Sequence, residues 1–130
     1  MSKELFIQTD EQRQWLEKLE TISESVKRHA QQTDEQATFP FENFQKLREI
    51  GYTKITLPKE YGGDGFTVYD ALLLHETLAS YCGSTGLAVS WTIQNVGEIF
   101  ENRYWNPKKL DWFGGEIANG ATVNRAVSEF

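Results

Sequence analysis

The chain has 130 residues, of which 39% are hydrophobic, 13% aromatic and 25% charged. This length and composition fit one globular domain that can bury a hydrophobic core. The net charge of −6 and the pI near 4.9 argue against a surface that binds nucleic acids or anionic membranes.

The single cysteine, Cys82, cannot form an internal disulfide, and the N-terminal sequence has no secretory signal pattern. These two features predict a cytoplasmic protein. No apolar run approaches the roughly 20 residues that a membrane-spanning helix requires. We therefore expect no membrane association.

A first helix is predicted over residues 10–32. Thr9 and Gln12 have the spacing of a capping box, in which each side chain bonds the backbone amide of the other residue. Apolar residues then recur every three or four positions and form one helical stripe. The stripe consists of Trp15, Leu19, Ile22, Val26 and Ala30. Residues 33–38 are polar and predict a loop.

A short second helix is predicted after Pro40, which suits a first helical turn because its missing amide proton has no partner there. Its expected buried face consists of Phe41, Phe44 and Leu47. Gly51 stands where a left-handed C-terminal cap belongs. Residues 52–57 are expected to be extended.

Two apolar helices are predicted next. Thr67 is the expected N-cap of the first, which ends at Gly83, and Ser84 is the expected N-cap of the second. The buried face of the first consists of Ala71, Leu74, Leu78 and Cys82, widened by Leu72, Leu73 and Ala79. The second is apolar nearly all round, so it is central or covered by something else. We expect other domains to cover part of it.

Asn106 and Pro107 predict the start of a fifth helix that runs to about residue 118. Gly114 and Gly115 weaken it by about 1 kcal/mol each. Residues 119–120 form a turn, and residues 121–127 predict a short strand. Because a lone strand cannot satisfy its backbone groups, we expect a fragment of a longer protein. The predicted fold is all-α, a bundle of about five helices that ends in one short strand of a missing β domain.

No catalytic or metal-binding residue is predicted from the residue patterns. His75 and Glu76 begin an HExxH-like pattern, but Ala79 occupies the second histidine position. Residues 62–65 are glycine-rich, but the Gly-Lys-Ser/Thr of a phosphate-binding loop does not follow them. No pair of carboxylates has apolar neighbours that would raise a pKa for acid–base catalysis.

Residues 57–66 read LPKEYGGDGF, after a helix that ends in glycine. This pattern resembles the N-terminal helical domain of acyl-CoA dehydrogenases, in which a P-x-x-Y-G-G-x-G turn follows such a helix. The matching residues are Gly51, Pro58, Tyr61, Gly62, Gly63 and Gly65. The resemblance covers residues 10–129. It implies an N-terminal helical domain over residues 1–120 and the first strand of a truncated middle β domain over residues 121–130.

The resemblance also implies binding residues. In that family the matching apolar helix lines the pocket for the acyl tail, which implies substrate contacts by Val89, Thr92, Ile93 and Val96. An ordinary core role for these four residues is the alternative. Residues 125–129 resemble a Y-x-x-T-E strand that bonds the flavin of FAD, so Val127 and Ser128 are the implied cofactor-binding residues. Two departures are Arg125, in place of an aromatic residue, and Phe130, in place of a proline.

The implied full-length protein is a homo-oligomeric flavoprotein of fatty acid metabolism that forms an α,β double bond in acyl-CoA thioesters. Its electron-transfer partner is unknown. The family's catalytic glutamate belongs to a C-terminal domain, so no residue of these 130 inherits that role. We expect the fragment alone to be inactive and not to retain FAD. Two alternatives remain at this stage: a flavin-dependent monooxygenase of the same fold, and a non-catalytic helical interaction module.

Overall fold

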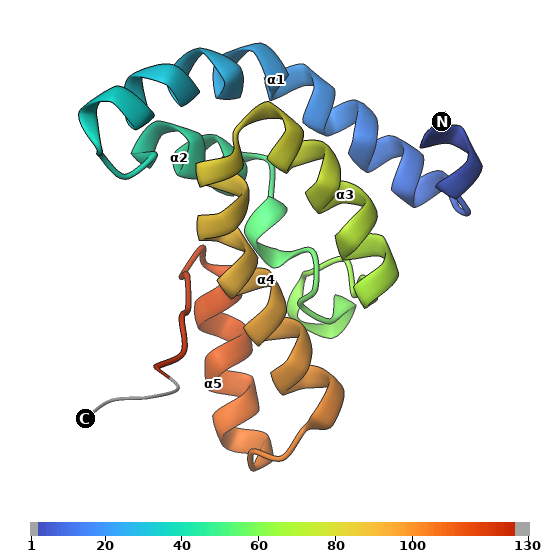
Figure 1. Cartoon of the computed structure of the whole chain (residues 1–130). Coiled ribbons are helices and arrows are strands. Elements are labelled where there is room, and N and C mark those ends of the chain that lie inside the picture. Colours follow the sequence, from blue (N-terminus) through green and yellow to red (C-terminus); the bar gives the residue numbers. More distant parts are fainter. Residues whose placement is uncertain (1–2, 127–130) are drawn as a thin grey trace.

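A computed structural model describes residues 3–126, which form five α-helices and three short 3-10 helices (Figure 1). The α-helices are α1 (Asp10–Gln36), α2 (Phe41–Glu49), α3 (Val68–Tyr81), α4 (Gly83–Asn102) and α5 (Pro107–Ala118). The 3-10 helices are η1 (Lys3–Phe6), η2 (Tyr52–Lys54) and η3 (Lys59–Tyr61). This arrangement confirms the predicted all-α fold class. No helix within residues 3–126 is long and apolar enough to cross a membrane.

Helix α1 begins as predicted and ends later than predicted. The Thr9 hydroxyl accepts from the backbone N–H of Gln12, and the Gln12 side chain accepts from the backbone N–H of Thr9. Residues 33–36 continue the helix, although their polar character had predicted a loop. The helix ends at Ala37, whose left-handed backbone (φ 50°) lets its N–H bond the carbonyls of Thr33 and Asp34.

Helix α2 buries Phe44 and Leu47 as predicted, but not Phe41. Phe41 is the first residue of the helix, and 73% of it is exposed. Its ring packs edge-on against that of Phe39, with the centroids 4.9 Å apart. The buried apolar face of α2 therefore consists of Phe44 and Leu47. Gly51, with φ 81°, has the predicted left-handed conformation.

Residues 52–57 are not extended, which corrects the prediction. They form η2 and successive turns, with bonds from the N–H of Ile55 to the carbonyl of Tyr52 and from that of Leu57 to that of Lys54. The segment is buried on several sides at once, so its apolar residues do not alternate with exposed ones. Tight local turns satisfy its backbone where a strand would need a partner.

The glycine-rich turn closes back on the segment that precedes it. The N–H of Gly65 bonds the carbonyl of Leu57 at 2.8 Å, and that of Phe66 bonds Ile55 at 2.9 Å. A side chain at Gly63 would overlap the backbone of Leu57, so this position has room for glycine alone. The turn thus fixes where α3 begins.

Helix α3 begins at a second capping box, between Thr67 and Asp70. Leu72, which the sequence placed on a buried face, is 64% exposed because it faces an open groove beside α4. The break to α4 comes at Cys82, whose extended backbone makes it the N-cap residue. Ser84 is therefore not the N-cap. Cys82 is buried and accepts a hydrogen bond at its sulfur from Thr85.

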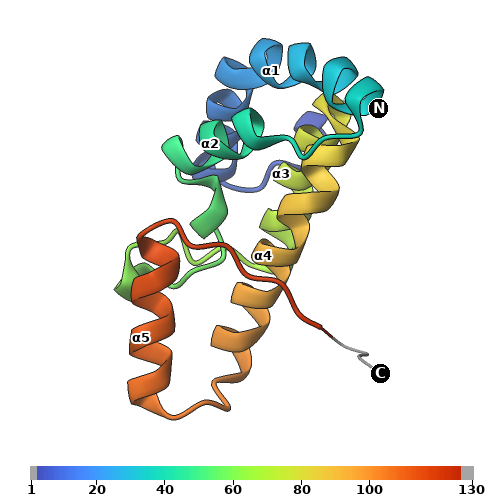
Figure 2. The same ribbon diagram turned by 90° about the vertical axis from the view of Figure 1, so that its left-hand side faces the viewer.

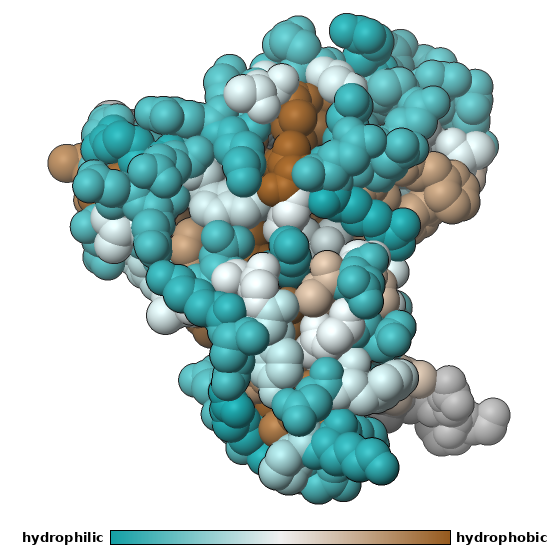
Figure 3. Space-filling model, turned by 180° about the vertical axis from the view of Figure 1, so that it is seen from behind, coloured by the Kyte–Doolittle hydropathy of each residue, from teal (hydrophilic) through white to brown (hydrophobic). Residues whose placement is uncertain are grey.

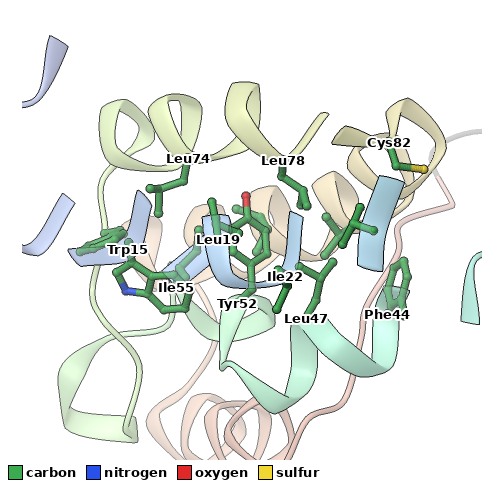
Figure 4. Close-up of a cluster of buried hydrophobic side chains, with 14 residues drawn as sticks. Trp15, Leu19, Ile22, Phe44, Leu47, Tyr52, Ile55, Leu74, Leu78 and Cys82 are labelled. Atoms are coloured by element: carbon green, nitrogen blue, oxygen red, sulfur yellow. The ribbon is translucent and has the colours of Figure 1, made fainter. Parts of the chain in front are cut away.

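Two hydrophobic clusters hold the fold together, and α4 contributes to both. The first joins α1, α2, α3 and the first half of α4 around Tyr52 and Ile55 (Figure 4). The second joins the last half of α4 to α5 and Leu57, and includes Val96, Ile99, Phe100, Leu110, Phe113 and Ile117. Leu87 and Trp91 lie on α4 outside both clusters and are exposed.

Residues 121–126 form neither helix nor strand, which corrects the predicted strand over that range; Val127 lies outside the described residues. A strand needs a paired neighbour, and within residues 3–126 no strand is present to pair with it. The segment instead runs from α5 across α4 (Figure 2). The domain boundary at residue 120 stays a prediction.

Candidate functional site

A groove of about 1020 Å³ lies between α3, α4 and the connector that joins α2 to α3 (residues 50–67). Its apolar wall consists of Phe66, Val68, Ala71, Leu72, Ile93 and Phe100. Its polar lining includes Thr56, His75, Ser90, Gln94, Glu98 and Glu101. The surface seen from behind is mostly hydrophilic, with smaller apolar areas (Figure 3). An open apolar groove of this size is typical of a ligand or partner site.

The connector and α4 meet closely at the base of the groove. The Thr56 hydroxyl donates to the carbonyl of Ile93 at 2.8 Å. Gly97 faces Thr56, and a Cβ at this glycine would lie 3.4 Å from the Thr56 Cβ. The Thr56 hydrogen bond and the absence of a side chain at Gly97 therefore hold the connector close against α4.

His75 is the histidine in the groove wall, and it is half-buried. Its Nδ1 lies 3.2 Å from the hydroxyl of Tyr52, which is fully buried. Burial lowers the pKa of His75, and a hydrogen bond with the Gly86 backbone offsets part of this effect. Burial also raises the pKa of Tyr52 well above its ordinary value. His75 therefore presents a neutral imidazole to the groove, and the buried Tyr52 hydroxyl occupies one of its ring nitrogens.

One end of the groove is acidic. Glu98 accepts from the Tyr104 hydroxyl at 3.0 Å and pairs with Arg125 at 3.1 Å, and these two partners lower its pKa. Glu101 lines the same region. Among the described residues that line the groove there is no lysine or arginine. The lining itself therefore carries negative charge, which Arg125 offsets at Glu98.

The four implied substrate residues lie in different environments in the structure. Ile93 lines the groove. Val89 is fully buried in the first cluster, and Val96 is fully buried in the second. Thr92 is buried and bonds the backbone of Val123. Contact of these residues with a substrate stays a prediction.

The implied cofactor residues, Val127 and Ser128, lie outside the described residues. The described part of that segment contacts α4 through Val123 and Arg125. Among residues 3–126, no three His, Cys, Asp or Glu side chains gather in a way that could hold a metal ion.

Two pairs of residues at the site were not predicted from the sequence. The His75–Tyr52 contact joins α3 to the connector, and the Thr92–Val123 contact joins α4 to the C-terminal segment. In each pair the two residues are far apart in the chain, and their residue types also occur in ordinary hydrophobic cores. The buried polar position of Thr92 within an apolar helix was the one available signal that it needs a partner.

Comparison with known proteins identifies the family. Residues 9–102 match the family described as acyl-CoA dehydrogenase, N-terminal domain. The chain belongs to the acyl-CoA dehydrogenase family. It is similar to the Bacillus subtilis protein named "Putative acyl-CoA dehydrogenase YdbM", with 44% identity over 96% of this chain and 33% of the relative.

Other relatives match less of the chain. A 3-sulfinopropanoyl-CoA desulfinase of Paraburkholderia xenovorans is 36% identical over 75% of this chain and 26% of the relative. The short-chain-specific acyl-CoA dehydrogenase of Clostridium acetobutylicum is 38% identical over 55% of this chain and 19% of the relative. The chain thus spans a third or less of the length of these curated relatives. No solved structure gives a significant match.

Proposed function

We propose that this chain is the N-terminal helical domain of an FAD-dependent oxidoreductase that introduces an α,β double bond into acyl-CoA thioesters. The observation that carries the proposal is the 44% identity, over 96% of the chain, with a protein named as an acyl-CoA dehydrogenase. Because the chain spans only 33% of that relative, the activity belongs to a longer polypeptide.

In this proposal, α4 and the groove beside it contribute one wall of the acyl-binding pocket. The apolar residues of the groove support this role, since an apolar chain gains about 0.8 kcal/mol for each methylene removed from water. Ile93 would contact the acyl chain directly. Val89 and Val96 would support the wall from the core, and Thr92 would lie between α4 and the C-terminal segment.

FAD would accept the hydride, and Val127 and Ser128 are the proposed residues of this chain that bind it. The resemblance supports this assignment, since Ser128 corresponds to the threonine of the Y-x-x-T-E strand and Val127 to the residue before it. No residue of this chain is assigned a catalytic role. The contribution of the chain is to bind and orient the substrate and the cofactor.

A second candidate reaction is desulfination, because relatives with 36% and 34% identity are named 3-sulfinopropanoyl-CoA desulfinases. A sulfinate group is anionic. Glu98 and Glu101 line the groove, and the described lining has no lysine or arginine to pair with an anion. This charge distribution favours an uncharged acyl group.

The test uses the full-length protein, purified and examined for bound flavin by its visible absorption. Butyryl-CoA, octanoyl-CoA and 3-sulfinopropanoyl-CoA are added without oxygen. Bleaching of the flavin by a saturated acyl-CoA is the expected result. A protein without flavin, or a flavin that no saturated thioester reduces, would overturn the proposal. Release of sulfite from 3-sulfinopropanoyl-CoA would support desulfination instead.

A matched pair of variants tests the groove. Leu72 lines the groove and is 64% exposed, whereas Leu87 is 68% exposed on α4 and is not part of the lining. Leu72→Glu should raise KM for acyl-CoA about tenfold or more, since burying a leucine is worth about 1.5–3 kcal/mol and each 1.4 kcal/mol is about a factor of ten. Leu87→Glu should leave KM near the wild-type value. Equal effects of the two substitutions would place the acyl chain elsewhere.

A further inference from the structure

The segment that leads to the proposed FAD-binding residues is attached to the helices at alternate positions. Ala121 packs against the second cluster, next to the bond from its N–H to the carbonyl of Glu116 that closes the end of α5. Val123 bonds Thr92, and Arg125 pairs with Glu98, both in α4. The segment runs as an extended trace across α4 (Figure 2), and in an extended chain alternate residues share one face. Positions 121, 123 and 125 are therefore the face that the helices hold.

Thr92 forms hydrogen bonds with both the N–H and the carbonyl of Val123. Its hydroxyl accepts from the N–H of Val123 at 3.1 Å and donates to the carbonyl of Val123 at 3.1 Å. Thr92 is only 2% exposed, so water competes little for these bonds. The Val123 side chain also packs against the second cluster. A shift of the segment by one residue would lose all of these contacts, because it would turn the other face toward α4.

Glu98 provides a second attachment in the last half of α4. It lies 3.1 Å from Arg125, and the Tyr104 hydroxyl, 3.0 Å away, fixes the same carboxylate. Thr92 and Glu98 are about 9 Å apart along a helix, at 1.5 Å per residue. Val123 and Arg125 are about 7 Å apart along an extended chain. The two spacings are similar, so α4 attaches the segment at two points along its length.

We propose that Thr92 is a positioning residue for FAD: it fixes the register of residues 121–126, which lead to the proposed cofactor-binding residues Val127 and Ser128. This inference rests on the proposed function. It also gives Thr92 a different role from the substrate contact that the family resemblance implied. The hydroxyl donates to the backbone of Val123 and accepts from it, so it serves the segment and not the acyl chain.

The test compares Thr92→Val with Thr92→Ser in the full-length protein. Valine keeps the shape of threonine and loses the hydroxyl, whereas serine keeps the hydroxyl. Thr33→Val is the matched control, because Thr33 is buried and donates to the His29 carbonyl in α1, far along the chain from the segment. The readouts are the Kd for FAD by titration of the apoprotein, the exchange rate of the Val123 amide hydrogen, and the melting temperature.

Thr92→Val should raise the Kd for FAD about tenfold, since two neutral hydrogen bonds are lost. It should also speed the exchange of the Val123 amide. Thr92→Ser should restore both values, and Thr33→Val should change neither. Faster exchange with an unchanged Kd would overturn the inference and leave the proposed function standing. A wild-type protein that binds no FAD would overturn the proposed function, and the inference with it.

Discussion

The side-chain amide of Gln12 donates to the carboxylate of Asp70 across 2.6 Å. Both residues belong to capping boxes, at the start of α1 and of α3. Burial raises the pKa of Asp70, but hydrogen bonds from Gln12 and Thr67 lower it by more, so the net pKa is below the ordinary value. The starts of two helices distant in the chain are thus joined by one bond.

Gln12→Glu should destabilise the fold by about 2 kcal/mol at pH 7, since it replaces a donor to a carboxylate with a second carboxylate. Glutamate still suits the capping box with Thr9, so the loss comes from the contact with Asp70. The loss should shrink as the pH falls and one carboxyl group becomes protonated. Urea unfolding at pH 7 and pH 4, referred to wild type at the same pH, measures it.

The double variant Gln12→Glu with Asp70→Asn is the control for this prediction. It exchanges donor and acceptor, because the introduced asparagine amide can donate to the introduced carboxylate. It should recover most of the lost stability at pH 7. If the double variant is as unstable as the sum of the two single ones, the contact between these side chains does not stabilise the fold.

His75 should make the fold less stable at acid pH. Its pKa in the folded state lies below the unfolded value of about 6.5, so below that pH the unfolded chain binds a proton more readily. The stability that neutral His75 contributes is complete above pH 6.5 and is lost as the pH falls through the folded pKa. A tenfold difference in proton affinity between the folded and unfolded chains corresponds to about 1.4 kcal/mol.

Unfolding by urea at pH 7.5, 6.5 and 5.5 tests this prediction. His75→Gln should have a shallower dependence than wild type over this range, because its side chain does not titrate. Equal slopes for the two proteins would mean that another group causes the loss of stability.

Tyr52→Phe should lower the free energy of unfolding by about 1 kcal/mol at pH 7.5, since it removes the buried hydroxyl that contacts His75.

Neighbouring glycines in α5 should respond oppositely to alanine. A Cβ at Gly114 would lie 2.6 Å from a ring carbon of Tyr61, whereas a Cβ at Gly115 would have nothing within 4 Å. Gly114→Ala should cost about 1–3 kcal/mol through overpacking. Gly115→Ala should add up to about 1 kcal/mol through helix propensity. Thermal unfolding of the two variants decides this, and stabilisation by Gly114→Ala would show that Tyr61 can move aside.

Two phenylalanines of α2 should differ in their contribution to stability. Phe44 is 8% exposed and belongs to the first cluster, whereas Phe41 is 73% exposed. Phe44→Ala should cost about 3 kcal/mol or more, as for other buried phenylalanines. Phe41→Ala should cost about 0.5 kcal/mol, as for most surface substitutions. Chemical denaturation measures both, and a large loss for Phe41→Ala would mean that its ring is covered in solution.

Local signals predicted much of the fold. The capping box at Thr9, the N-cap at Thr67, the left-handed Gly51 and the start of α5 at Asn106 depend on neighbouring residues, and the structure confirms all four. The prediction for residues 52–57 was wrong because their burial on several sides has no period that a sequence pattern could reveal. The prediction for Leu72 was wrong because an apolar residue at a helical spacing can face a groove as well as a core.

The candidate site was less predictable, because its contacts join distant segments. The family resemblance indicated α4, but the sequence alone does not show which of its faces meets the groove and which meets Val123. Thr92 illustrates the difficulty: its burial was foreseeable, but its partner lies 31 residues away. Such a pairing depends on how α5 turns the chain back, which is a property of packing and not of local pattern.

The buried sulfur of Cys82 lies at the break between α3 and α4, so its reactivity can report on the separation of these two helices. A thiol reagent can reach this atom only when the two helices separate, so the rate of labelling measures that opening without any added probe. These 130 residues contain one cysteine, so labelling of the full-length protein is followed at the peptide that carries Cys82. Labelling followed with and without FAD or an acyl-CoA would therefore show whether either ligand closes the junction between these helices.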